Sequence, residues 1–78
     1  MNRNKTKKTL WEYYVNKNSD QDGNNEVHRE DCWLCPSSEN RELLGKFYHC
    51  SFAVISAKLG GYPNADGCAR CSPDCRST

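Results

Sequence analysis

The chain has 78 residues and a formal net charge of +1. Leucine, isoleucine, valine and phenylalanine together number 11, too few for an apolar core to offset the entropy of the chain unaided. The near-zero charge argues against a wholly disordered chain, and no apolar run is long enough to cross a bilayer. We therefore expect one small domain with tails, which a metal ion or disulfides must stabilise.

The first segment of the chain, residues 1–9, is basic and has no acidic side chain. Its cations are Arg3, Lys5, Lys7 and Lys8. We expect a disordered tail that keeps the chain soluble, and weak, salt-sensitive contacts with nucleic acid are the alternative role.

Two further segments precede the expected folded module. Residues 10–15 form a short aromatic segment, whose apolar residues recur at helical spacing after Thr9, a possible cap: Leu10, Trp11, Tyr14 and Val15. Residues 16–27 are polar and turn-rich without periodicity, which predicts a flexible linker. Residues 28–78 would then form the module.

A first short helix is expected near the start of this module. Ser37 or Ser38 can cap a turn that runs from Glu39 to Leu44, and Gly45 can end it. The aromatic run after that glycine looks extended, which predicts a strand.

A second helix has clearer signals at both ends. Ser51 is a suitable N-cap, and the Gly60-Gly61 pair ends the helical pattern. We expect a small core beside the metal, formed by residues at helical spacing and two aromatic neighbours: Phe52, Ile55, Leu59, Phe47 and Tyr62.

Four of the six cysteines form two spaced pairs, Cys32-Trp-Leu-Cys35 and Cys68-Ala-Arg-Cys71. Two thiolates with this spacing can occupy two corners of one metal tetrahedron. The pattern therefore predicts a structural zinc site with four ligands, Cys32, Cys35, Cys68 and Cys71, at the centre of an irregular α+β domain with two short helices and a short sheet.

Four other residues can also bind a metal: His28, His49, Cys50 and Cys75. With the two pairs they make eight ligands, the number that two tetrahedral sites require. We favour one zinc ion over two, because cysteine is often a small buried residue and histidine often a surface one. With one site, Cys50 belongs to the core and Cys75 is a spare or alternate ligand.

An even number of cysteines in a short chain also fits a disulfide framework. A secreted miniprotein with three disulfides and no metal is therefore an alternative. The N-terminal residues show no apolar signal segment, so we expect a reducing cytoplasm and free thiols.

Near the end of the chain, an expected alanine-bearing helix from Phe52 to Ala57 is followed by Gly61-Tyr62 and by the run Cys68-Ala-Arg-Cys71-Ser-Pro73. This order of features resembles the end of the metal-binding domain of the Ada DNA-repair protein. In that family four cysteines bind zinc, and the first of them accepts a methyl group from a DNA phosphotriester. The resemblance therefore implies a zinc site and, at Cys32, a possible methyl acceptor.

The first cysteine pair departs from the family pattern. It is spaced CxxC rather than CxxxC, and Glu30, Asp31 and Trp33 replace the basic residues around it. We therefore carry over the metal site and keep methyl transfer to Cys32 as an alternative function. Other catalysis has little support, because no acid or base is suitably spaced to orient His49 towards a nucleophilic cysteine.

The charges of residues 28–78 balance, and a zinc ion with four thiolates would leave the module mildly acidic. Outside the N-terminal tail, the candidate phosphate contact is Arg70. We expect an adaptor or regulator that contacts a protein or nucleic acid, with no membrane and no small-molecule substrate. The candidate contact surface is aromatic: Trp33, Phe47, Tyr48, Trp11, Tyr13 and Tyr14.

Overall fold

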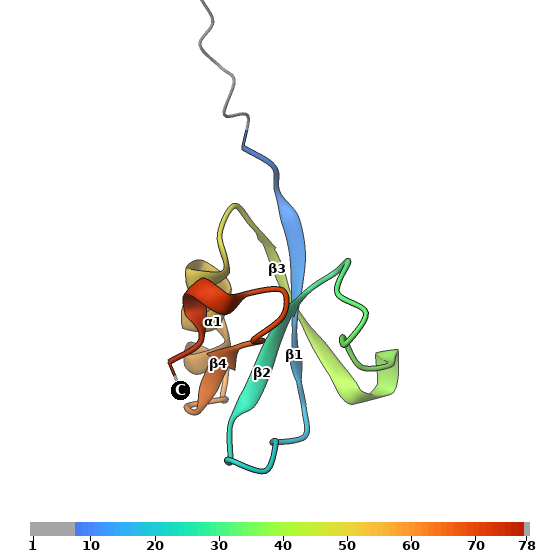
Figure 1. Cartoon of the computed structure of the whole chain (residues 1–78), viewed down its shortest axis with the longest axis vertical. Helices are drawn as coiled ribbons and strands as arrows, with labels where there is room; N and C mark the ends of the chain where they lie inside the picture. The colour runs from blue at the N-terminus through green and yellow to red at the C-terminus, as the bar shows by residue number, and fades with distance from the viewer. Residues whose placement is uncertain (1–7, 78) are drawn as a thin grey trace, which may run out of the picture.

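The computed structural model describes residues 8–77 and has an α+β fold (Figure 1). The strands are β1 (Trp11–Asn16), β2 (Asn25–Arg29), β3 (Arg41–Phe47) and β4 (Ala65–Gly67). One α-helix, α1 (Cys50–Leu59), and two 3-10 turns, η2 (Ser38–Asn40) and η3 (Pro73–Cys75), complete the described part. The sheet order is β3-β1-β2-β4. This confirms a small α+β domain.

Strands β1 and β2 form an antiparallel hairpin in which Tyr14 lies opposite His28. In β1, Tyr13 and Val15 alternate with more exposed residues, which is the pattern of a strand with one buried face. The structure thus differs from the helical turn expected in residues 10–15. The segment belongs to the folded domain because its buried residues pair with β2 and β3 on either side.

The expected linker, residues 16–27, is the loop of this hairpin together with parts of both strands. Asp20 organises the loop, because its side chain accepts hydrogen bonds from the backbone N–H groups of Asp22 and Asn24, both at 2.9 Å. Gly23 adopts a positive φ of 84°, which favours glycine. The polar composition therefore encodes a turn with its own hydrogen bonds, and the module begins near Trp11 instead of His28.

Strand β3 replaces the first expected helix. Only the three residues of η2 are helical there, and the chain then pairs with β1 in the antiparallel direction. The pairing shifts by one residue between Tyr13, which lies opposite Gly45, and Tyr14, which lies opposite Leu43, so Leu44 is the extra residue; Gly45 has a φ of 130°. A bulge of this kind needs glycine's freedom. Long-range pairing with β1 has overridden the local helix signals.

Strand β4 pairs with β2 in the parallel direction, with Asn25 opposite Ala65 and Val27 opposite Gly67. All three residues of β4 are buried. Helix α1, which lies between β3 and β4 in the chain order, packs against the sheet. This pairing brings the end of the chain alongside the residues that follow β2.

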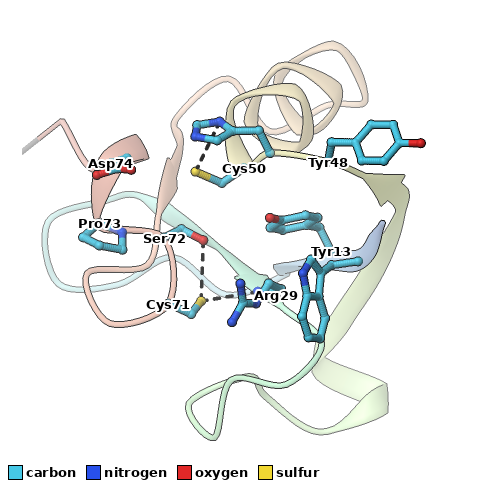
Figure 2. Close-up of a pocket in the computed structure, with 10 residues that line it drawn as sticks. Tyr13, Arg29, Tyr48, Cys50, Cys71, Ser72, Pro73 and Asp74 are labelled. Atoms are coloured by element: carbon cyan, nitrogen blue, oxygen red, sulfur yellow. Dashed lines mark hydrogen bonds between the residues drawn. The ribbon is translucent and has the colours of Figure 1, made fainter. Parts of the chain in front are cut away.

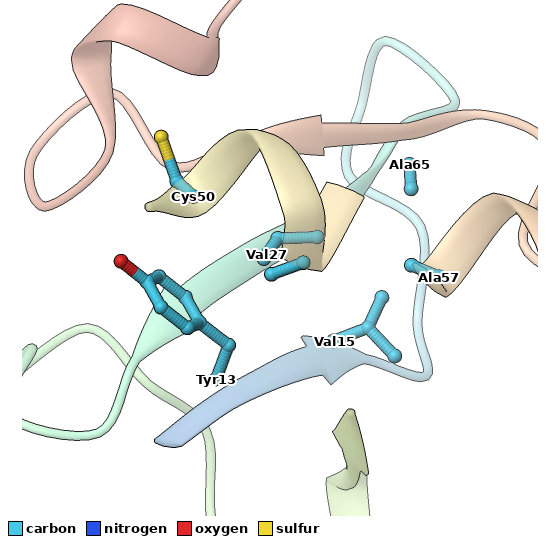
Figure 3. Close-up of a cluster of buried hydrophobic side chains, with 7 residues drawn as sticks. Tyr13, Val15, Val27, Cys50, Ala57 and Ala65 are labelled. Carbon is cyan, nitrogen blue, oxygen red and sulfur yellow. The ribbon is translucent and has the colours of Figure 1, made fainter. Parts of the chain in front are cut away.

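The buried core consists of small and β-branched residues (Figure 3): Tyr13, Val15, Val27, Cys50, Ala53, Ala57 and Ala65. The expectation that Phe52, Ile55 and Leu59 form the core is wrong, since these side chains are 56, 55 and 84% exposed. Helix α1 instead turns Ala53 and Ala57 to the sheet, because their small side chains allow a close approach. Phe47 and Tyr62, also expected in the core, are partly buried and pack against it.

The second helix is confirmed in position, with a different cap. His49 is the N-cap, and its Nδ1 accepts a hydrogen bond of 3.1 Å from the backbone N–H of Ser51. The helix ends at Gly60, whose backbone N–H donates to Ser56 and Ala57.

Three residues of the expected basic tail, Arg3, Lys5 and Lys7, lie outside the described residues. Within residues 8–77, no helix combines the length and the apolar character that a membrane span requires.

Candidate metal centre

Four side chains from two distant parts of the chain meet beside the sheet: His28, Cys32, Cys68 and Cys71. Their ligand atoms all lie within 4.8 Å of one another. His28 is in β2 and Cys32 is in the turn that follows, while Cys68 and Cys71 follow β4. The backbone N–H of Cys68 donates to Val27 at 3.0 Å, which extends the parallel pairing to the group. The β2–β4 pairing therefore assembles the four donors.

The imidazole of His28 is the most unusual member of this group. It is 1% exposed, and neither ring nitrogen has a hydrogen-bond partner among the described residues. Glu26 approaches Nε2 to 3.5 Å without the geometry of a hydrogen bond. A buried polar group without a partner costs about 1–3 kcal/mol. An ion among the thiols would satisfy one nitrogen, and a carboxylate such as that of Glu26 commonly accepts from the other.

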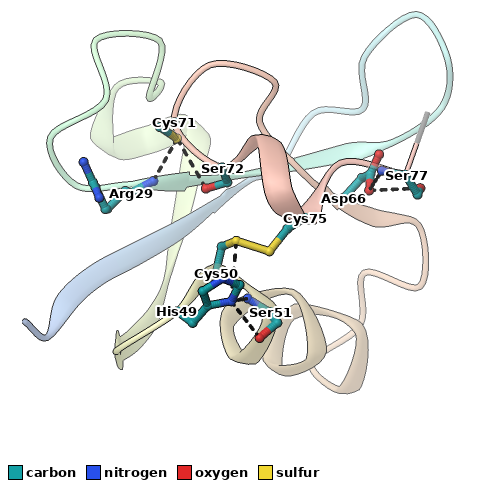
Figure 4. Close-up of a disulfide and its surroundings, with 9 residues drawn as sticks. All are labelled: Arg29, His49, Cys50, Ser51, Asp66, Cys71, Ser72, Cys75 and Ser77. Carbon is teal, nitrogen blue, oxygen red and sulfur yellow. Dashed lines mark hydrogen bonds between the residues drawn. A yellow bond between two sulfur atoms is a disulfide. The ribbon is translucent and has the colours of Figure 1, made fainter. Parts of the chain in front are cut away.

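The sulfur of Cys71 lies in a polar environment. Burial raises the pKa of this thiol, but the adjoining imidazole of His28, the backbone N–H of Arg29 and the hydroxyl of Ser72 outweigh that effect and lower the pKa to about 6. The Arg29 N–H lies 3.3 Å from the sulfur and the Ser72 hydroxyl 3.6 Å (Figures 2 and 4). These contacts favour the thiolate, which is the form that binds a metal.

Cys32 has the opposite tendency. Burial is the main cause that raises the pKa of Cys32 to about 12, and its sulfur lies 4.0 Å from that of Cys68. The Cys68 sulfur in turn accepts a hydrogen bond of 3.4 Å from the backbone N–H of Arg70. The group thus holds one thiol that ionises readily and one that ionises with difficulty until a cation neutralises it.

Cys35, an expected ligand, does not belong to this group. It is half-buried, and its sulfur lies 3.7 Å from the guanidinium of Arg41, which also donates to the carbonyl of Pro36. Burial raises the pKa of Cys35, and Arg41 partly offsets that rise. The structure therefore brings together three of the four expected cysteines, with His28 in the place of the fourth.

A second group contains the other expected ligands, His49, Cys50 and Cys75. Their ligand atoms also lie within 4.8 Å of one another, but Cys50 and Cys75 are joined as a disulfide (Figure 4). This bond was not expected for a reducing compartment. It links the first residue of α1 to η3, and thus to the segment that carries Cys71.

A cleft of about 180 Å³ separates the two groups (Figure 2). Cys71 lines one side of it, and His49, Cys50 and Asp74 line another. Trp11, Tyr48 and Arg29 form the outer wall, where the Arg29 guanidinium stacks 4.3 Å from the Trp11 ring. Arg29 is also paired with Asp31 at 2.7 Å, so its charge is partly neutralised.

An open apolar groove of about 470 Å³ follows the outer side of α1. Phe47, Phe52, Ile55 and Leu59 line it together with the small residues Ser56 and Gly60. Sequence reasoning assigned these side chains to the core and missed the groove. The width of the apolar surface of α1 is a signal that could have revealed the groove. This surface includes the buried Ala53 and Ala57 and extends well beyond them, so one sheet cannot cover all of it.

The expected aromatic surface is only partly available. Trp33 is 73% exposed, with the Arg70 guanidinium 5.3 Å from its ring, and Tyr48 is also exposed. Tyr13 belongs to the core at 4% exposure, so its place in a contact surface is wrong. Trp11 and Phe47 pack partly against the core. Tyr14 is half-buried beneath Arg41.

Comparisons of the chain with protein-family models, with curated proteins and with solved structures gave no match. The two cysteine groups, the cleft and the groove are therefore the features of the molecule that bear on its function.

Proposed function

We propose that the protein is a small zinc-binding interaction module, in which one structural zinc ion is held by His28, Cys32, Cys68 and Cys71. The observation that carries this proposal is the buried imidazole of His28, which lies among three thiols without a hydrogen-bond partner among the described residues. A metal ion supplies the missing partner.

The donor set favours zinc over harder cations. Three sulfurs and one imidazole form the Cys3His set that is common in structural zinc sites, whereas magnesium and calcium prefer oxygen ligands. Four protein ligands fill the tetrahedron, so no position remains for water or a substrate. The proposed role of the ion is therefore to stabilise the fold.

The groove along α1 is the proposed contact surface, and a protein segment with apolar side chains is its proposed occupant. None of the six residues that line the groove carries a charge. Nucleic acid would require basic groups near its phosphates, so the groove is poorly suited to it. Exposed Phe, Ile and Leu side chains that adjoin one another commonly mark protein contacts.

Native mass spectrometry of zinc-loaded variants tests the metal centre. His28→Ala and Cys71→Ser are each expected to lose the ion, or to weaken its binding by at least 100-fold. Cys35→Ser is the matched control, because it removes an expected ligand that lies outside the group, and it should retain the ion. Loss of zinc from Cys35→Ser together with retention in His28→Ala would restore the four-cysteine site.

Peptide selection against the zinc-loaded protein tests the groove. We expect the selected peptides to be rich in apolar residues, and Leu59→Lys to weaken their binding at least tenfold. Trp33→Ala is the control, because Trp33 is exposed but lies outside the groove. Peptides that depend on Trp33 and not on Leu59 would move the contact surface to the aromatic patch, and capture of nucleic acid alone would exclude a protein partner.

The two alternative functions find less support in the geometry. Cys32, the methyl acceptor that the Ada resemblance implies, is only 9% exposed and does not line the cleft. A gain of one methyl group on Cys32 after incubation with methylated DNA, measured by intact mass, would reinstate that function. A miniprotein with three disulfides requires pairing of the four cysteines that are free here.

A further inference from the structure

We propose that reduction of the Cys50–Cys75 disulfide creates a second metal site, formed by His49, Cys50 and Cys75. This site is separate from the proposed structural zinc centre, and its occupancy depends on the redox state of the protein. Its ligand class is a divalent cation that accepts sulfur and imidazole donors, with zinc as the first candidate.

The geometry of the second group supports this inference. The three ligand atoms already lie within 4.8 Å of one another, and Nδ1 of His49 is 3.9 Å from the sulfur of Cys50. Ligand atoms on a tetrahedron around zinc are roughly 3.3–3.8 Å apart, given bond lengths near 2.0–2.3 Å. Small side-chain rotations therefore suffice once the two sulfurs are no longer bonded.

His49 is free to make such a rotation because its ring is exposed. In the oxidised state Nδ1 accepts from the Ser51 backbone N–H and lies 2.9 Å from the Ser51 hydroxyl. Metal binding through Nδ1 would exchange these contacts for the ion, and the Ser51 hydroxyl could then cap α1. Binding through Nε2 would leave the cap in place.

The cleft gives the second site an open side. His49, Cys50 and Asp74 all line it. Three protein ligands leave one position of a tetrahedron for water or for the carboxylate of Asp74. The second site thus differs from the first, whose four ligands close the coordination sphere, and it can exchange its ion and fourth ligand with solvent.

The redox step balances with a thiol or phosphine reductant. The disulfide accepts two electrons and two protons, and the S–S bond becomes two thiols. A phosphine is oxidised to its oxide with one water molecule, which supplies the oxygen and the two protons. When zinc binds, each thiol releases its proton to solvent and the thiolate sulfur bonds to the ion. While Cys50 and Cys75 are joined as a disulfide, neither sulfur is a thiolate that can bind the ion.

Zinc titration followed by native mass spectrometry tests the inference. The oxidised full-length protein is expected to hold one ion, and protein reduced with a phosphine is expected to hold two. A reduced wild-type protein that binds no more ions than the oxidised protein would overturn the proposal, whereas an oxidised protein that holds none would contradict only the structural centre.

Variants assign the second ion. Under reducing conditions, Cys75→Ser and His49→Ala should each hold one ion, while the control Cys35→Ser should still hold two. Cys75 is partly buried, so its variant can fail to fold; the exposed His49→Ala then decides, and its retention of both ions at wild-type affinity would contradict the assignment. The ion retained at the first centre shows that the variant is folded, and it tests the proposed function separately.

Discussion

At the scale of single residues, Cys71 and Cys32 differ in how readily they ionise although they belong to one donor group. The pKa of Cys71 is lowered to about 6 and that of Cys32 is raised to about 12. Cys71 also lines the cleft, whereas Cys32 is buried. Both differences make Cys71 the more reactive thiol when the metal is absent.

We expect iodoacetamide to alkylate Cys71 first in chelator-treated protein that retains its circular dichroism spectrum. Its rate should rise between about pH 5 and 7, as the thiolate forms around a pKa of about 6, while Cys32 stays unmodified. Peptide mass spectrometry after short exposures measures both rates. Equal rates at Cys71 and Cys32 at pH 7 would contradict the expected difference.

The same pKa has a consequence for stability. Folding lowers the pKa of Cys71, so the folded state favours the thiolate. This contribution is present above the unfolded pKa of roughly 8.5 and is lost as pH falls through about 6. Urea unfolding of metal-free protein should therefore show a decrease in the Cys71 contribution from pH 8 to 5, and Cys71→Ser should flatten that pH dependence.

Gly67 is a second residue on which the metal centre depends. A Cβ at this position would lie 2.6 Å from the Ser72 carbonyl oxygen and 2.8 Å from Cβ of Cys75. Gly67→Ala should therefore displace the segment after Cys71, lower the stability by about 1–3 kcal/mol and weaken zinc binding. Gly23→Ala is the control, since its Cβ meets nothing within 4 Å and its positive φ costs about 1–2 kcal/mol. It should leave zinc affinity unchanged.

At the scale of elements, α1 turns its smallest side chains inward and its largest outward. Ala57 is fully buried, whereas Leu59 is 84% exposed. Ala57→Leu is therefore expected to destabilise the fold by about 1–3 kcal/mol through overpacking. Leu59→Ala should change the free energy of unfolding by no more than about 0.5 kcal/mol. Urea unfolding measures both, and a large loss in Leu59→Ala would show that the groove is closed in solution.

The position of α1 could be predicted from the sequence, but its orientation could not. Local signals, namely a capping residue and the Gly60-Gly61 stop, determine where a helix begins and ends. The side of α1 that faces the sheet depends on how closely the helix backbone can approach the strands. The small side chains of Ala53 and Ala57 allow a short distance between helix and sheet, which Phe52 and Ile55 would prevent. Helical periodicity alone does not distinguish these two apolar sides.

Strand β3 and the β1–β2 hairpin show a second limit of predicting structure from the sequence. Residues 39–44 have helical signals, yet only residues 39 and 40 are helical, in η2, and residues 41–44 belong to β3 because β1 has an edge to pair with. The polar residues 16–27 suggested a linker, although the side chain of Asp20 gives the loop its own hydrogen bonds. Both outcomes depend on contacts between distant segments, which propensity does not describe.

The candidate site was predictable to a similar degree. The CxxC spacing pointed to Cys68 and Cys71, and the structure places both in one group with Cys32. The spacing did not show that His28, and not Cys35, is the fourth member of the group, because the parallel pairing of β2 with β4 determines which side chain lies there. The pairing joins segments about 40 positions apart and leaves no local pattern in the chain.

At the scale of the whole molecule, stability depends on few buried side chains. The core contains two valines, three alanines, one tyrosine and one cysteine. A core of this size contributes only a few kcal/mol, so the metal and the disulfide are expected to supply much of the net stability.

Removal of the metal should therefore lower the thermal midpoint substantially. Zinc at 100 times its dissociation constant adds about 2.7 kcal/mol, which corresponds to about 10–20 °C for a domain of this size. Thermal melts of oxidised protein, with excess zinc and with a chelator, measure the difference. The Cys71→Ser variant is the control and should melt at one temperature in both conditions. A wild-type midpoint that the chelator leaves unchanged would argue against a stabilising ion.

The convergence of β4, two proposed metal ligands and the disulfide on residues 65–75 has a consequence for the order of events during synthesis. The ribosome makes β1, β2, β3 and α1 before this segment. Until it emerges, His28 and Cys32 lack their partner ligands, Cys50 lacks its disulfide partner, and β2 has one unpaired edge. The donor group, the disulfide and the β2–β4 pairing can therefore form only after residues 65–75 have been made.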